Sequence, residues 1–292
     1  MLRTEMGSDT TQRPDRTVVD GVEVLGSLSP SRASDFMSCP LLFRFRTVDR
    51  LPEPFSPDAV RGTVVHRVLE NLFDLPAADR TPDRAASLLG PAWDELVAAE
   101  PDIAEMFGAD SSGGPEIAAW LASCRESLGR YFTLEDPTRL EPAEREAYVE
   151  TLLDSKLLLR GFVDRLDVTP TGEIRVVDYK TGKAPGESFE AKALFQMKFY
   201  ALVIWRTRGV VPRVLQLIYL GSGELLRYTP DEQDLLATER KVEALWRAIV
   251  SATETGDWRP SKSSLCGWCA HQSICPAWGG TPPPIPTPER SS

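Results

Sequence analysis

The chain has 292 residues and a formal net charge of −10, from 43 acidic and 33 basic residues. This length fits one large domain, and a hydrophobic content of 42% excludes wholesale disorder. The acidity argues against a generally basic protein that coats DNA, and no run approaches the roughly 18 apolar residues of a membrane span.

Both ends of the sequence are polar and lack a core-forming pattern. Residues 1–26 show little periodicity and no apolar segment of a secretory signal, so they predict a disordered tail on a cytoplasmic protein. Residues 280–292 are rich in proline and predict a second disordered tail. One folded domain is therefore expected over residues 27–279.

Helices dominate the first half of the expected domain. Residues 29–45 predict a capped helix with Cys39 late in it. Residues 61–74 place valine and leucine side chains on one face, with His66 at the edge of that face. Residues 83–132 are helical and acidic, with a Gly/Ser interruption at 111–114, and predict a helical insertion over about 80–140.

The acidity is concentrated in and around this insertion. Residues 92–154 contain 15 Asp and Glu against four Arg, a balance of −11, so the other 229 residues sum to +1. The overall charge is therefore an average, and the rest of the chain can present basic surface to phosphate groups.

The second half of the domain alternates strands and helices. Strands are expected at 145–151, 157–168 and 174–180, then a helix at 188–205 capped by Ser188, a hairpin formed by 213–220 and 224–229, and a helix at 231–254 that follows Thr229-Pro230. The sequence has no Gly-x-x-x-x-Gly-Lys-Ser/Thr motif, so it predicts no ATP-driven motor of its own.

The hairpin of 157–168 and 174–180 brings acidic residues together. A turn near Thr171–Gly172 gives paired positions whose numbers add up to 342 or 343, which puts Asp164 opposite Asp178 or within one residue of it. Lys180 lies two residues after Asp178 and therefore on the same face of the strand. Two carboxylates and an ammonium group are thus expected to converge.

Facing carboxylates repel each other unless a cation lies between them. A hard ion such as Mg²⁺ or Mn²⁺ takes one or two carboxylates plus waters and phosphate oxygens, and it can lower the pKa of a bound water. Two carboxylates, an ammonium group and a divalent ion together suit hydrolysis of a phosphodiester. An ordinary solvated strand face with an Asp–Lys ion pair is the alternative, because Asp-x-Lys is common.

The cysteines indicate a metal site. Cys266, Cys269 and Cys275 form a Cys-x2-Cys-x5-Cys run, and a thiolate site usually takes four ligands. The fourth is either His271, which would make a zinc knuckle, or the distant Cys39. The remaining Cys124 lies in a helical pattern and is expected in the core.

A set of ordered motifs resembles the RecB-like nucleases of the PD-(D/E)XK superfamily. The residues that carry the resemblance are His66 in GTVVHRVLE, Asp164 in GFVDRLD, Asp178, Tyr179 and Lys180 in VVDYKTG, and Gln196 and Tyr200 in QMKFY. The flanking cysteines resemble those of the iron–sulfur subgroup, which includes Cas4-like and AddB-type nuclease domains. The resemblance runs over about residues 29–277.

The resemblance implies a fold. It predicts a restriction-endonuclease-like α/β core, in which helices flank a central mixed β-sheet. The acidic helical segment would be inserted into this core, and an iron–sulfur clasp would join the N- and C-terminal regions through cysteine segments around 39 and 266–275.

The resemblance also implies a role for each motif residue. The catalytic metal, Mg²⁺ or Mn²⁺, would be bound by His66, Asp164, Asp178 and the backbone carbonyl of Tyr179. The catalytic residues would be Lys180 with Asp178 and Asp164. Supporting and DNA-contacting residues would be Gln196 and Tyr200, and a 4Fe-4S cluster would be held by Cys39, Cys266, Cys269 and Cys275. A further acidic ligand would be Glu146 or Glu150, which the sequence does not separate.

The predicted function is that of a divalent-metal-dependent DNA nuclease, an exonuclease that acts at DNA ends in repair or recombination. Its partner would be DNA that is single-stranded or has free ends, together with a separate helicase. The alternatives are a weakly catalytic or non-catalytic iron–sulfur module that binds DNA for such a helicase, and a zinc-knuckle interaction protein.

Overall fold

The computed structural model describes residues 18–19, 21–107 and 114–286. Two compact units are formed, and each contains several separate stretches of the chain. The first unit comprises 1–54, 150–161 and 236–292, and the second comprises 55–149 and 162–235. None of the described helices is both long and apolar enough to cross a membrane.

The second unit contains an α/β arrangement. Its elements are α3 (Pro57–Leu72), α4 (Pro82–Ser87), α5 (Leu89–Ala99), α6 (Pro115–Leu134), most of β4 (Glu144–Leu152) and β5 (Leu157–Val168), β6 (Ile174–Lys180), α7 (Glu187–Arg208), β7 (Val214–Tyr219) and β8 (Glu224–Tyr228). The helical insertion lies in this unit as α4 to α6, joined by a 3-10 turn at Pro101–Phe107. Residues 111–113 of its predicted interruption lie outside the described residues.

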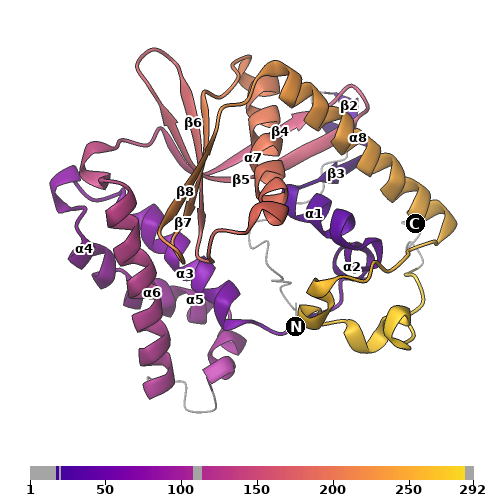
Figure 1. The fold of residues 1–292 in the computed structure, drawn as a ribbon, viewed down its shortest axis with the longest axis horizontal. Helices are drawn as coiled ribbons and strands as arrows, with labels where there is room; N and C mark the ends of the chain where they lie inside the picture. Colours follow the sequence, from indigo (N-terminus) through magenta and orange to yellow (C-terminus); the bar gives the residue numbers. More distant parts are fainter. Residues whose placement is uncertain (1–17, 20, 108–113, 287–292) are drawn as a thin grey trace. The chain divides into compact units, whose positions relative to one another are not determined.

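The sheet is mixed, in the order β3-β5-β6-β7-β8, with β4 also paired to β5 (Figure 1). Strands β5 and β6 form the predicted antiparallel hairpin, and Arg165 pairs with Val177, which confirms the expected register. Strand β7 runs parallel to β6, and β8 returns antiparallel to β7. The fold class predicted from the sequence, a mixed sheet flanked by helices, is therefore confirmed.

The alternation along β6 divides its side chains between two helical layers. Val177 and Tyr179 belong to a buried apolar cluster that includes α3, α5 and α6. Asp178 and Lys180 point the opposite way, toward α7. One face of β6 therefore contributes side chains to the hydrophobic core, and the other face contributes polar side chains to the candidate site.

Helix α7 begins slightly earlier than the pattern predicts. Gly186 is its N-cap residue and Glu187 its first residue, so Ser188 lies inside the first turn. Helix α8 (Glu232–Thr255) begins after Asp231, whose carboxylate accepts a hydrogen bond from the backbone N–H of Asp234 at 2.8 Å. A side-chain cap of this kind satisfies a helix N–H that has no backbone partner.

The first unit contains the N-terminal strands and the cysteines. Its elements are β1 (Val18–Val19), β2 (Val22–Glu23), β3 (Gly26–Leu28), α1 (Pro30–Ser38), α2 (Pro40–Phe43), a π-helical turn at Arg44–Val48, the start of β5, most of α8 and 3-10 turns at Ser264–Trp268, Gln272–Ile274 and Pro276–Trp278. Strands β1 and β2 precede residue 27, the predicted start of the folded domain. Residues 1–17, 20 and 287–292 of the predicted tails lie outside the described residues.

The predicted helix over 29–45 is interrupted at Cys39. Ser29 caps α1 as expected and accepts a hydrogen bond from the N–H of Arg32. Cys39 then adopts an extended backbone, with φ −165° and ψ 113°. The reason is Pro40, since a proline disfavours helical geometry in the residue before it. Cys39 thus lies between two helices rather than late in one.

Candidate active site

The site is built around the backbone of Tyr179, at the end of β6. Its N–H donates a hydrogen bond of 2.7 Å to Oδ2 of Asp164 on β5. Its carbonyl oxygen lies 2.9 Å from Nε2 of His66 on α3. The hairpin register and the packing of α3 therefore bring these three residues together from segments far apart in the chain.

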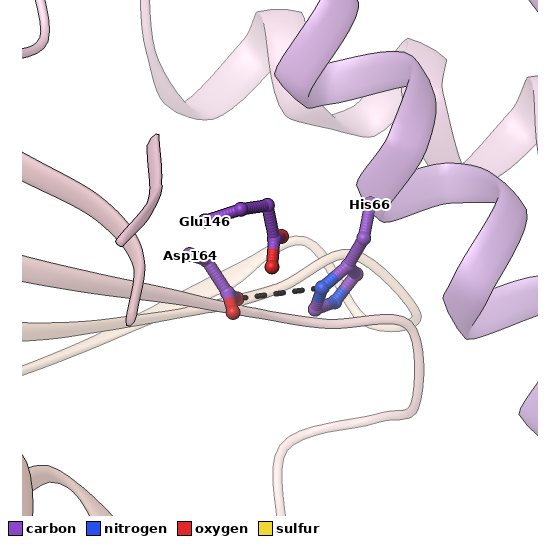
Figure 2. Close-up of side chains that lie close together, drawn as sticks. All are labelled: His66, Glu146 and Asp164. Carbon is purple, nitrogen blue, oxygen red and sulfur yellow. Dashed lines mark ion pairs between the residues drawn. The ribbon is translucent and has the colours of Figure 1, made fainter. Parts of the chain in front are cut away.

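Three potential metal ligands converge at this point. His66, Glu146 and Asp164 each offer one ligand atom, and these atoms lie within 4.8 Å of one another (Figure 2). Figure 2 shows the three side chains pointing toward one another, with Nδ1 of His66 3.6 Å from Oδ2 of Asp164. Among the described residues, no other group of three His, Cys, Asp or Glu meets this distance.

Of the two glutamates that the sequence left open as a further ligand, Glu146 lies with His66 and Asp164, whereas Glu150 belongs to the first unit. The backbone of Glu146 has φ 42°, a conformation that non-glycine residues adopt at a cost. A strand residue with such a backbone departs from simple alternation, so periodicity alone could not predict which glutamate would join the site.

The environment of Glu146 favours its protonated form. Burial and then the nearby charge of Asp164 raise the pKa of its carboxyl to about 7. Two carboxylates in one partly buried place cannot both ionise cheaply without a cation. The donors are one imidazole and two carboxylates, with the Tyr179 carbonyl beside them. Oxygen-rich sets of this kind suit hard divalent ions such as Mg²⁺ and Mn²⁺.

A second set of contacts surrounds Asp178. Its Oδ2 lies 2.7 Å from Nζ of Lys180, and its Oδ1 accepts a hydrogen bond of 2.9 Å from Nε2 of Gln196. Lys180 in turn donates a hydrogen bond of 2.9 Å to Oε1 of Gln196. Nε2 of Gln196 is also 3.5 Å from the hydroxyl of Tyr200, one turn along α7. The predicted residues thus lie in two adjoining groups, since Asp178 is held by Lys180 and Gln196.

Opposing influences set the protonation of this pair. Burial and the charge of Asp164 raise the pKa of Asp178 to about 6, although Lys180 acts in the opposite direction. Burial also works against the charge of Lys180, but Asp178 and Asp164 outweigh it and keep the pKa of Lys180 above its ordinary value. The ammonium group therefore stays charged at neutral pH, where it can stabilise negative charge.

A buried ion network supports the opposite face of the strands. Arg165 is 1% exposed and makes hydrogen bonds of 2.8 and 3.1 Å with the two carboxylate oxygens of Glu135. It also donates one of 2.7 Å to the hydroxyl of Tyr179. Glu135 lies outside the quoted motifs, and Arg165 lies within GFVDRLD but was given no role there. The signal for Arg165 was a charged residue at an inward position between Val163 and Asp167.

The predicted cysteine ligands line one pocket of the first unit. This pocket of about 250 Å³ is bordered by Cys39, Cys266, Cys269 and Cys275. The backbone N–H of Ser261 lies 3.4 Å from Sγ of Cys39, and that of Ser263 lies 3.4 Å from Sγ of Cys266. In the described part of the first unit no three ligand atoms come within 4.8 Å, whereas one tetrahedral zinc ion holds its sulfurs about 3.8 Å apart.

His271 is engaged elsewhere. Its Nε2 lies 2.8 Å from Oε1 of Glu53, and its ring packs edge-on against Phe45 at 5.2 Å between centroids. The imidazole is 4% exposed and does not border the cysteine pocket. The fifth cysteine, Cys124, is fully buried in α6 and belongs to the core, as predicted.

Comparison with known proteins identifies the fold family. Residues 27–276 match the sequence pattern of the PD-(D/E)XK nuclease superfamily. The chain belongs to this superfamily. A crystal structure of a proposed exonuclease from Eubacterium rectale superposes with a TM-score of 0.55, covering 89% of this chain and 91% of that one, at 13% identity. Such low identity makes this a similarity of fold alone.

Relatives of this PD-(D/E)XK chain occur in phages and bacteria. The Gene 69 protein of Mycobacterium phage L5 is 29% identical over 123 residues, which are 41% of this chain and 40% of that protein. The Gene 69 protein of Mycobacterium phage D29 is 27% identical over 197 residues, or 62% and 70%. An ATP-dependent helicase/deoxyribonuclease subunit of Streptococcus equi subsp. zooepidemicus (strain H70) is 29% identical over 158 residues, which are 53% of this chain and 14% of the streptococcal protein. The match thus spans less than half of the phage L5 protein and a small part of the streptococcal one.

Proposed function

We propose that this protein is a divalent-metal-dependent DNA nuclease. The observation that carries the proposal is the convergence of His66, Glu146 and Asp164 within 4.8 Å, beside the half-buried Lys180, in a member of a nuclease superfamily. The metal would be Mg²⁺ or Mn²⁺, held by these three side chains, with Asp178 and the Tyr179 carbonyl as neighbouring oxygen donors. When bound, it would polarise the phosphate and supply an acidified water.

The protein side chains would orient and stabilise the reacting groups. Lys180 remains charged and can donate a hydrogen bond to the attacking water or to the developing negative charge on phosphate. Gln196 fixes the ammonium, because its amide contacts Lys180 and Asp178 at once. Tyr200 supports that amide from the next helical turn.

The substrate would be DNA with a single-stranded or free end, and the activity that of an exonuclease in repair or recombination. Similarity to an ATP-dependent helicase/deoxyribonuclease supports the choice of DNA and a helicase as partner. The sequence lacks an ATP-binding loop of the Gly-x-x-x-x-Gly-Lys type. Duplex DNA would therefore be opened by a separate motor.

The test is cleavage of labelled single-stranded and duplex DNA with Mn²⁺, Mg²⁺ or EDTA. Wild-type protein should degrade single strands in a metal-dependent manner, and Lys180→Ala should lose at least about a hundredfold in kcat, the order expected when one charge-stabilising donor is removed. Arg213→Ala is the matched control, because Arg213 is exposed at the other end of the sheet. Equal rates for Lys180→Ala and wild type would refute the site.

We also infer that the four pocket cysteines bind a 4Fe-4S cluster. The inference is supported by a common pocket for Cys39 and the C-terminal trio, and by backbone N–H groups directed at two of the sulfurs. Hydrogen bonds to thiolate ligands are a usual feature of such sites. The cluster would be structural, because it would join segments separated by more than 200 residues.

A further inference from the structure

A cleft opens beside the site in the second unit. It has a volume of about 500 Å³ and is bordered by His66, the Tyr179 backbone region and Lys180. Small-molecule sites typically measure about 300–1,000 Å³, so the cleft has room for a nucleotide-sized group beyond the reacting phosphate. The proposed metal ligands Glu146 and Asp164 do not border this cleft.

The charge of this cleft is mainly positive. Lys180, Lys183 and Lys192 border it, and both Lys183 and Lys192 are exposed. Among the described residues that border it, Asp58 is the one carboxylate, and it forms an ion pair with Arg61. The site therefore has an acidic part that suits a cation and an adjoining basic part that suits a phosphate.

The loop that carries Lys183 is fastened at both ends. Leu220 donates a backbone hydrogen bond of 2.7 Å to the carbonyl of Lys180, and Gly221 donates one of 3.0 Å to the carbonyl of Gly182. The N–H of Ala184 donates to the hydroxyl of Ser222 at 3.0 Å. These bonds lie on either side of Lys183, so they hold its backbone against the end of β7.

Gly221 is needed for this attachment. A Cβ atom there would come within 2.7 Å of the carbonyl oxygen of Thr181 and would also strike the backbone of Gly182. Only a residue without a side chain allows the two backbones to approach this closely. The backbone position of Lys183 is therefore fixed by the close packing of this loop against Gly221.

We propose that Lys183, together with Lys192, binds the phosphate that neighbours the cleaved one on a single DNA strand. This inference rests on the proposed nuclease function and names a substrate-positioning residue for it. A lysine ammonium binds phosphate as a point charge. Because Lys183 would contact a phosphate that does not react, it should contribute equally to ground-state and transition-state binding, which affects KM and leaves kcat unchanged.

The test compares Lys183→Gln and Lys183→Arg with wild type on thymidine oligonucleotides of decreasing length. Lys183→Gln should raise KM about three- to tenfold on long oligonucleotides with kcat within about twofold, whereas Lys183→Arg should keep a near-normal KM. The KM difference should vanish on a dinucleotide, which has only the phosphate that is cleaved. Arg213→Gln, which removes an exposed charge at the far end of β7, should leave KM unchanged.

A binding measurement keeps the two proposals separate. With EDTA and a fluorescent oligonucleotide, Lys183→Gln should lower the slope of log affinity against log salt by about 0.7, the value for one phosphate contact on a single strand. An unchanged slope and KM in a wild type that cleaves would overturn the Lys183 subsite alone. A wild type that binds with the expected slope but never cleaves with any metal would overturn the proposed function and retain the subsite.

Discussion

Gln196 donates a hydrogen bond of 2.9 Å from Nε2 to Oδ1 of Asp178, and this bond links helix α7 to strand β6. The other end of the same amide accepts a bond from Lys180. One neutral side chain thus hydrogen-bonds to both members of the Asp178–Lys180 ion pair. The arrangement fixes both charged groups without adding a charge of its own.

Replacing Gln196 by Leu should lower kcat about 10- to 100-fold, equivalent to about 1.4–2.7 kcal/mol of barrier, because Lys180 is no longer held in place. KM should change by less than about threefold, since Gln196 acts through Lys180. Steady-state kinetics on single-stranded DNA measures both. Gln233→Leu is the matched control, because Gln233 is exposed. A similar loss of kcat in both variants would contradict the assignment.

Glu146 makes the stability of the metal-free protein depend on pH. Its folded pKa of about 7 lies above the ordinary value of 4.5, so the folded state binds a proton more tightly than the unfolded state does. The stabilisation from this proton is complete below pH 4.5 and is lost as the pH rises through about 7. Urea unfolding in EDTA should therefore show a falling midpoint over this range, and Glu146→Gln should flatten that fall.

Bound metal should reverse the pH dependence of stability near pH 7. Binding of Mn²⁺ must displace the proton from Glu146, so affinity should rise with pH up to about 7 and protons should be released. Isothermal titration calorimetry in buffers of different ionisation enthalpy measures this release. Glu146→Gln should bind Mn²⁺ more weakly and release fewer protons. Equal affinity in the variant and wild type would remove Glu146 from the ligand set.

Arg165 is a buried charge whose loss should destabilise the fold. Arg165→Met leaves Glu135 buried without its main partner, which should cost about 3–5 kcal/mol of unfolding free energy. The double variant with Glu135→Leu should recover much of this loss, because neither charge is then buried. Arg213→Met should change stability by less than about 0.5 kcal/mol, since its ion pair is exposed and 3.9 Å long. Denaturant unfolding tests all three.

Much of this site could be predicted because strand pairing obeys local rules. The turn between β5 and β6 fixes the register, and the period of two in a strand fixes which residues share a face, so Asp178 and Lys180 lie together as expected. Asp164 instead lies in the adjoining group with His66 and Glu146. Helical spacing likewise puts Gln196 and Tyr200 on one face of α7, whereas their place beside Lys180 was implied by the family resemblance.

The remaining features depend on local deviations and on tertiary packing. Glu146 and Glu150 lie four apart on β4 and are equivalent by alternation. They differ in that Glu146 has a positive φ and lies with His66 and Asp164, whereas Glu150 belongs to the first unit. The burial of Arg165 was not expected, because it depends on an ion pair with Glu135. Glu135 lies at the C-terminal end of α6, 30 residues earlier in the chain. The helical interruption at Cys39 was readable in principle from Pro40.

Cys39 provides the test of the cluster. Cys39→Ala should lose iron and acid-labile sulfide and should destabilise the protein by up to about 4–5 kcal/mol, the loop-closure value for a covalent link of this span. Iron analysis, visible absorption under anaerobic conditions and denaturant unfolding measure these effects. Cys124→Ala is the control: it also removes a thiol, but from the core of α6, so its iron content should equal that of wild type. A colourless wild type with one zinc per chain, retained in Cys39→Ala and lost in His271→Ala, would refute the cluster and favour the zinc knuckle.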